Sequence, residues 1–258
     1  ITDTHNKELS EYYNVFIKTK TKKYRKKIDR TATQFFDKIL CNSNFSKENI
    51  KKIYNKESEV CLLGIPANNN INLKNIDLRE NIIVAIIPLI HSKNPLVIVK
   101  AFDYILNKKK YTNFKLFLIG NGHLKELIEN YITQHKLKDY VILKDYIIEK
   151  EKEDILKNSK IGLYLSVDEP FGLTVLEYMQ YGLISIVSNN GGPSEIITNN
   201  KTGLCIDPFD EIELGNKIID ILENTTNYNL MSEEAIKEIN TKFLLSHFIK
   251  RLEEKLLF

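Results

Sequence analysis

The sequence predicts an α/β fold whose larger domain is a doubly wound, parallel, Rossmann-like sheet. From residue 82 onward, short apolar and β-branched runs alternate with longer segments whose apolar residues recur at helical spacing. Strands and helices that alternate in this way favour a parallel sheet with right-handed crossovers and helices on both faces. With 258 residues, of which 43% are hydrophobic and 28% charged, the chain can bury the core that such a sheet requires.

We place the strands of this sheet and their helices at residues 82–242. The first strand, 82–87, is a β-branched run that Pro88 ends, and Pro95 suits the first turn of the helix that follows. The other strands are expected at 114–119, 140–144, 161–167, 184–188 and 203–206. Helices are expected at 95–107, 124–135, 150–159 and 172–181, after Pro193, and then at 211–224, 232–242 and 246–256.

The first 66 residues hold too few elements for a domain of their own. Strands are expected at 38–42 and 60–65, and helices at 31–36 and 47–54. We therefore expect 1–66 to be the carboxyl-terminal part of a preceding α/β domain, joined by a linker at 67–81 that contains Asn68-Asn-Asn-Ile-Asn72. The chain starts Ile1-Thr-Asp-Thr-His, without a Met and without the basic and apolar stretches of a signal peptide, so we expect a fragment.

The charge distribution limits the classes of partner. The net charge of +3 is small, and the basic excess gathers in Lys18-Thr-Lys-Thr-Lys-Lys-Tyr-Arg-Lys-Lys27. A solvated basic helix or loop is the first interpretation of this run, and contact with an anionic membrane surface is the second. No aromatic platform or recognition motif accompanies the run, so we expect no nucleic-acid partner.

The cysteines and the apolar runs indicate the compartment. Cys41, Cys61 and Cys205 are far apart and form no CxxC pair, which argues against a disulfide framework and a structural zinc site. Cys61 and Cys205 lie in apolar runs and are expected to be buried thiols in a reducing compartment. The longest apolar run, 82–90, is about half of the ~20 residues that a membrane span needs. We therefore expect a cytoplasmic protein, with the cytoplasmic face of a membrane as the alternative location.

The richest segment for chemistry is Ser166-Val-Asp-Glu-Pro-Phe-Gly-Leu-Thr-Val-Leu-Glu177. It places two carboxylates, Glu169 and Glu177, on either side of a strand-to-helix turn. Such a turn lies at the carboxyl end of a strand, where open α/β sheets bind ligands, and the N–H groups at a helix start attract anions. The residues alone leave two interpretations open: a site for an anion with a sugar on either side, or a capped helix start with one solvated glutamate.

A second feature favours the ligand site. The next strand ends in Asn189-Asn-Gly-Gly-Pro-Ser-Glu195, and Thr202-Gly203 opens the one after it. Together with Glu169-Pro-Phe-Gly-Leu-Thr-Val-Leu-Glu177 and Gly182, these residues resemble the E-x7-E region of retaining glycosyltransferase family 4. Leu118-Ile-Gly-Asn-Gly122 is similar to the family's glycine-rich turn, 38–43 and 60–66 resemble the end of its amino-terminal domain, and 243–256 resembles its last helix.

The resemblance implies one half of a GT-B architecture, in which residues 243–258 cross back to the amino-terminal domain. It implies a retaining, metal-independent glycosyltransferase that uses a nucleoside diphosphate sugar and no cofactor, and acts on a glycan, lipid or other acceptor. The catalytic residues would be Glu169, which holds donor-sugar hydroxyls, and Lys93, which neutralises charge on the leaving diphosphate. Glu177 would bind the ribose hydroxyls. The other residues implied at the nucleotide sugar are Gly120, Gly122, Phe171, Gly172, Leu173 and Thr174.

Two departures from the family keep an alternative open. The family usually carries Gly-Arg before the lysine, where this chain has Ile87-Pro88, and we expect most of the amino-terminal domain with the acceptor site to be missing from these residues. We therefore expect the isolated chain to be inactive and to need that domain in cis or in trans. The alternative is a non-catalytic or split subunit that binds a nucleotide sugar. A third interpretation is another GT-B enzyme, such as an epimerase or a phosphorylase. The family's histidine-containing loops are matched by none of His5, His91, His123, His135 and His247.

Overall fold

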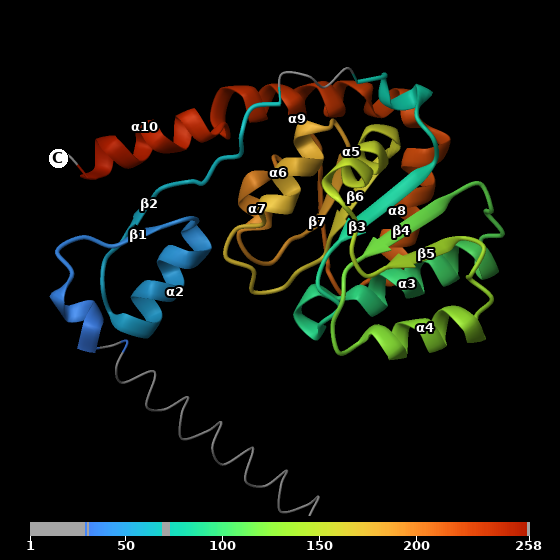
Figure 1. Ribbon diagram of the computed structural model, residues 1–258, viewed down its shortest axis with the longest axis horizontal. Coiled ribbons are helices and arrows are strands. Elements are labelled where there is room, and N and C mark those ends of the chain that lie inside the picture. Colours follow the sequence, from blue (N-terminus) through green and yellow to red (C-terminus); the bar gives the residue numbers. More distant parts are fainter. Residues whose placement is uncertain (1–28, 30, 69–72, 257–258) are drawn as a thin grey trace, which may run out of the picture.

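The computed structural model describes residues 29, 31–68 and 73–256 (Figure 1). The basic run Lys18–Lys27, His5 and most of the Asn-rich linker sequence lie outside these residues.

A six-stranded parallel sheet forms the centre of the larger part, as the sequence predicts. The strand order is β5-β4-β3-β6-β7-β8, which is the order of dinucleotide-binding doubly wound sheets. The chain moves outward from β3 to β5, returns to β6 and then moves outward in the other direction. The switch point therefore lies between β3 and β6. The strands are β3 (Ile82–Ile86), β4 (Lys115–Ile119), β5 (Val141–Lys144), β6 (Ile161–Tyr164), β7 (Ile184–Ser188) and β8 (Leu204–Ile206).

Helices cover both faces of the sheet (Figure 1). Helices α3 and α4 lie on one face, where α8 packs against α3, and α5 and α6 lie on the other, where α9 packs against α6. The helices are α3 (Pro95–Asp103), α4 (Lys125–Gln134), α5 (Glu149–Asn158), α6 (Leu173–Gln180), α7 (Pro193–Ile196), α8 (Glu211–Glu223), α9 (Asn229–Lys242) and α10 (Leu245–Leu256). Because both faces are covered, β6 and β7 are buried along their whole length.

Several elements differ from their predicted bounds. The strand expected at 60–65 is limited to Glu59–Val60, and the helix expected at 31–36 ends in a 3-10 turn, Thr33–Phe35. Strand β6 ends at Tyr164 and not at residue 167, because Val167 turns away and its N–H bonds Ser92 O at 2.8 Å. Helix α3 ends at Asp103 and continues as a π-helical turn over Tyr104–Lys108.

The amino-terminal segment forms a small unit beside the sheet. Strands β1 (Leu40–Cys41) and β2 (Glu59–Val60) pair in parallel and are joined by α2 (Asn44–Tyr54). A short 3-10 turn, η1 (Thr33–Phe35), precedes them.

The last helix connects this unit to the large sheet. Figure 1 shows α10 running from the end of α9 toward β1 and β2. Ile65 N bonds Phe243 O at 2.9 Å and Leu245 N bonds Ile65 O at 2.7 Å, while the guanidinium of Arg251 donates to Leu62 O at 2.8 Å. The carboxyl-terminal helix thus lies against the amino-terminal segment.

Part of the expected linker packs against the large domain. The 3-10 turn η2 (Ile76–Leu78) places Ile76 in the core at 1% exposure. The buried guanidinium of Arg79 donates to Ser159 O at 3.1 Å and Tyr181 O at 2.8 Å, next to the ends of α5 and α6. A cation is favourable at helix carboxyl ends. Burial lowers the pKa of Arg79 to about 10.

Among the described residues, the helices are all too short or too polar to cross a lipid bilayer.

Candidate active site at the switch point

The candidate site lies where the loops after β3 and β6 meet. Strands β3 and β6 pair at Ile83 with Ile161 and at Val84 with Gly162, and then separate. The two loops are tied together beyond that point: the Asn94 side chain donates to Leu165 O at 2.9 Å, in addition to the bond from Val167 N to Ser92 O. Open α/β sheets bind ligands in such a crevice.

Lys93 and Glu169 face each other across this crevice. Lys93 Nζ forms an ion pair with Glu169 Oε2 and lies 3.3 Å from the Tyr164 hydroxyl. The two side chains are 13% and 22% exposed, so the pair is largely shielded from solvent. Burial alone would lower the pKa of Lys93, but the bond to Glu169 and the contact with Tyr164 outweigh it and raise that pKa. Lys93 is therefore a cation at neutral pH.

The Gly191-Gly192 pair holds the backbone beside Glu169. Gly192 N donates to Glu169 O at 2.8 Å, and Gly191 has a φ of +99°. A Cβ atom at Gly191 would lie 2.9 Å from Glu169 O, and one at Gly192 would lie 2.2 Å from Pro170 O. Both positions exclude side chains because the two loops touch through their backbones.

The start of α6 is the place where the sequence predicts an anion site. Gly172 has a φ of +103° and precedes the first helical residue, Leu173, which is 47% exposed. The N–H groups at Leu173 and Thr174 begin the helix, where its dipole favours negative charge. Phe171 is 2% exposed and its ring belongs to the core, so a ligand contact at this position would come from its backbone.

Glu177 is held by a lysine from the neighbouring helix. Lys152 Nζ of α5 lies 3.3 Å from Glu177 Oε1 and 3.0 Å from Glu149 Oε1. Burial would lower the pKa of Lys152, but the bonds to Glu149 and Glu177 outweigh it and raise that pKa. Lys152 carries no motif that would mark it in the sequence. The only available signal was that α5 and α6 cover the same face of the sheet (Figure 1), where neighbouring helices can be expected to touch.

Gly120 and Gly122 lie where the loop after β4 contacts the loop after β3. A Cβ atom at Gly120 would lie 1.9 Å from Ile87 O, and one at Gly122 would lie 2.4 Å from Leu89 O. The glycines therefore let the loop after β4 pack directly on the loop after β3. Their contact with a nucleotide remains a prediction.

Two histidines belong to these loops, His91 after β3 and His123 after β4. The rings of His91 and His123 are 5.1 Å apart at their centroids, and both side chains are exposed. Within residues 29, 31–68 and 73–256, no three His, Cys, Asp or Glu side chains are grouped so as to hold a metal ion.

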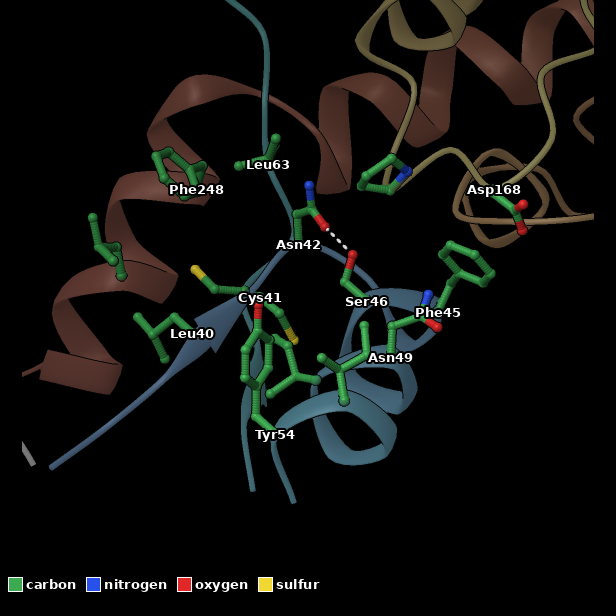
Figure 2. A pocket seen from close by; sticks show the side chains of 15 residues that line it. Leu40, Cys41, Asn42, Phe45, Ser46, Asn49, Tyr54, Leu63, Asp168 and Phe248 are labelled. Carbon is green, nitrogen blue, oxygen red and sulfur yellow. Dashed lines mark hydrogen bonds between the residues drawn. The ribbon is translucent and has the colours of Figure 1, made fainter. Parts of the chain in front are cut away.

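A hollow of about 570 Å³ lies beside the site and does not contain it (Figure 2). Figure 2 shows Phe45 from α2, Phe248 from α10 and Leu63 around this hollow, with Asp168 at its edge. Its lining is mostly apolar, and it reaches the Glu169 loop through Asp168 and Pro170.

Residues 67–238 match the protein family described as Glycosyl transferases group 1. Sucrose-phosphate synthase 4 of Arabidopsis thaliana is 26% identical over 164 residues, which are 58% of this chain and 16% of that protein. The GDP-Man:Man(3)GlcNAc(2)-PP-Dol alpha-1,2-mannosyltransferase of Dictyostelium discoideum is 23% identical over 256 residues, which cover 92% of this chain and 48% of that protein.

Solved glycosyltransferases share the fold. The sucrose-phosphate synthase of Thermosynechococcus elongatus has a TM-score of 0.75 at 18% identity, over 91% of this chain and 62% of its own. Anabaena Alr3699/HepE, in complex with UDP and glucose, has a TM-score of 0.73 at 16% identity, over 88% of this chain and 64% of its own. The chain spans less than two thirds of each of these four proteins. The predicted Rossmann-like half of a GT-B architecture is confirmed by this likeness. Because the family match covers most of its length, the chain belongs to the group 1 glycosyl transferases, as its motifs predicted.

Proposed function

We propose that the protein is a retaining glycosyltransferase and that this chain binds its donor, a nucleoside diphosphate sugar. The observation that carries the proposal is the shielded Lys93–Glu169 pair, which lies at the switch point of a domain from this family. The pair sets a cation for phosphate and an acceptor for sugar hydroxyls side by side.

Each part of the donor has a chemical partner in this crevice. The diphosphate would bind between Lys93 and the N–H groups that begin α6, and the ribose hydroxyls would donate to Glu177. When Lys93 turns to the diphosphate, the Glu169 carboxylate becomes available to the sugar hydroxyls. Phe171 and Gly172 would contribute backbone contacts between these two ends.

The residues would act on the leaving group by electrostatics. Cleavage of the sugar–phosphate bond leaves charge on the diphosphate, and a fixed ammonium and fixed N–H dipoles stabilise that charge without rearranging. We propose that no metal ion is needed for this step. We assign no nucleoside base to the donor, because HepE was solved with UDP and the Dictyostelium relative is named for GDP-Man.

We further propose that the rest of an amino-terminal domain packs against β1, β2 and α2, in cis or in trans, and brings the glycan or lipid acceptor. Two strands of two residues each make a sheet that is marginal by itself. The apolar hollow between α2 and α10 adjoins this small sheet. An acceptor held by another domain explains why the chain alone would bind the donor without transferring the sugar.

A cytoplasmic location, with Lys18–Lys27 against an anionic membrane surface, belongs to the same proposal. The charge of that run supports it, since each basic residue near such a surface gains on the order of 1 kcal/mol.

The test combines binding and transfer. Calorimetry of residues 1–258 with UDP, GDP and ADP, each with added EDTA, is expected to give binding to one of them. Release of the nucleoside diphosphate from the matching sugars is expected only when the upstream domain is present. Failure to bind any of the nucleotides would refute the donor site, and turnover by the isolated chain would refute the need for a second domain.

A second candidate function is a subunit that binds a nucleotide sugar without catalysis. Pro88 favours it, because the family usually has an arginine there and the diphosphate would lose one cation. Binding by the complete protein without transfer to any acceptor tested would support this candidate.

A further inference from the structure

Glu195 caps a helix that belongs to the other segment of the molecule. Glu195 lies on α7 of the large domain, and its carboxylate accepts from Asn44 N at 2.7 Å and Phe45 N at 2.6 Å, the first N–H groups of α2. The Asn44 side chain donates to it as well, at 2.9 Å. These N–H groups have no partner within their own helix, and a carboxylate is favourable at a helix start.

Ser43, the residue before α2, reaches the loop of the candidate site. Its buried hydroxyl donates to Pro170 O at 2.5 Å and accepts from Ser46 N at 3.0 Å. Pro170 directly follows Glu169 in the chain. The cap of α2 is therefore also a bond to the backbone of the site loop.

The same turn that carries Glu195 holds Glu169 from the other side. Gly192 N donates to Glu169 O at 2.8 Å, and Glu195 N donates to Gly192 O at 3.0 Å. A closed cycle of contacts results, which runs from Glu169 to Gly192, Glu195, the start of α2, Ser43, Pro170 and back to Glu169.

We propose that this cycle, the Ser43–Glu195 clasp, fixes the direction of the Glu169 carboxylate and couples the amino-terminal segment to donor-sugar binding. Ser43 and Glu195 are positioning residues that act through the backbone of residues 169 and 170. The inference rests on the proposed function, because it assigns Glu169 to the sugar. Glu177 and Lys152, at the nucleotide end, lie outside the cycle.

The placement predicts a selective effect on the sugar. Without the clasp, the Glu169 loop loses the contacts that hold it from the side of α2. The sugar should then bind more weakly, while binding of the nucleotide is unaffected. A purely structural role would weaken both ligands alike. The useful quantity is therefore the ratio of the Kd for a nucleoside diphosphate sugar to the Kd for the nucleoside diphosphate.

Calorimetry on the full chain tests this with UDP and UDP-glucose, or with GDP and GDP-mannose if the wild type prefers them. Ser43→Ala and Glu195→Gln are expected to raise the Kd of the nucleotide sugar about tenfold, which is the loss of one hydrogen bond between a sugar hydroxyl and the charged Glu169. The Kd of the nucleotide should rise less than twofold. Ser46→Ala, whose hydroxyl bonds Asn42 in the same turn, and Glu126→Gln, on the exposed first turn of α4, are the matched controls. Equal weakening of both ligands, or no change of the ratio, would overturn the proposal.

A double variant adds a second measurement. Glu195→Gln combined with Glu169→Gln should weaken nucleotide-sugar binding no further than Glu169→Gln alone, because both changes remove the same contact. Additive losses would show that Glu195 acts elsewhere.

Hydrogen exchange separates failure of the clasp from failure of the proposed function. Amides of residues 168–174 should exchange faster in Glu195→Gln than in Glu126→Gln, while those of β3 stay unchanged. Should the wild type bind none of these nucleotides, the donor proposal fails, and exchange alone decides whether the clasp holds the loop. Unchanged exchange at 168–174 would reject the clasp.

Discussion

The hydroxyl of Tyr178 accepts a hydrogen bond from the backbone N–H of Ile86 at 2.8 Å, where β3 and β6 separate. Tyr178 comes from α6 and is fully buried, so its ring stands between the two strands and the helix. Gly162 of β6 makes room for it, because a Cβ atom there would lie 2.4 Å from the ring. Burial raises the pKa of Tyr178, which keeps the hydroxyl neutral. The hydroxyl thus accepts from a backbone N–H that has no partner on β6, because the two strands have already separated there.

Tyr178→Phe is expected to destabilise the fold, because it leaves the Ile86 N–H unpaired beside the core. The cost of such a group is about 1–3 kcal/mol in the free energy of unfolding. Urea unfolding measures it, with Tyr146→Phe as the control, since Tyr146 is 82% exposed. Equal midpoints for the two variants would contradict the role of this hydroxyl.

The alkaline limit of stability is expected to depend on Tyr131. Its hydroxyl donates to Asp103 at 2.9 Å, and its ring stacks on His135. Burial first, and then the bond to Asp103, raise the pKa of Tyr131 to about 12 from an ordinary value of 10.0. The fold favours the neutral phenol, so its contribution is complete below pH 10 and is lost as the pH rises toward 12.

Thermal unfolding between pH 8 and 12 checks this direction. Tyr131→Phe should have a lower Tm than the wild type at pH 8, and the difference should shrink above pH 10. A gap in Tm that widens above pH 10 would show the opposite sign of linkage.

The sheet was predictable because strands covered on both faces are short apolar runs, and β7 has the predicted bounds of residues 184–188. The buried position of Arg79 was not predictable. It lies in a polar stretch of sequence, and nothing there indicates that its side chain reaches the ends of two helices. Lys93 and Glu169 follow strands on either side of the switch point, so their proximity could be predicted from the sequence. Ser43 and Pro170 are 127 residues apart and meet through tertiary packing, which local periodicity does not report.

Glu177→Gln is expected to weaken binding of a nucleoside diphosphate. A hydrogen bond to a charged group contributes about 1.5–3 kcal/mol, which corresponds to about tenfold or more in Kd. Stability should change little, because the ion pair with Lys152 leaves Glu177 35% exposed and such pairs contribute about 0–1 kcal/mol.

Glu149→Gln is the matched control for Glu177→Gln. It removes the other carboxylate bound to Lys152 and leaves the ribose contact in place, so its Kd should stay near the wild-type value. Equal weakening by both variants would assign the effect to Lys152 and remove Glu177 from the ribose.

Pro88→Arg is expected to tighten binding of the nucleoside diphosphate. Pro88 follows β3, is exposed, and lies in the same loop as Lys93, so a guanidinium there can approach the phosphates without disturbing the core. Arginine matches phosphate oxygens with two parallel hydrogen bonds, which supports a gain in affinity of about tenfold.

Pro88→Ala is the control for Pro88→Arg, because it removes the same ring and adds no charge. Calorimetry at two salt concentrations should show the gain for Arg only, and a smaller gain at high salt. If the Arg and Ala variants fold normally and bind equally, the diphosphate does not lie beside residue 88, and its contacts must come from Lys93 and the start of α6 alone.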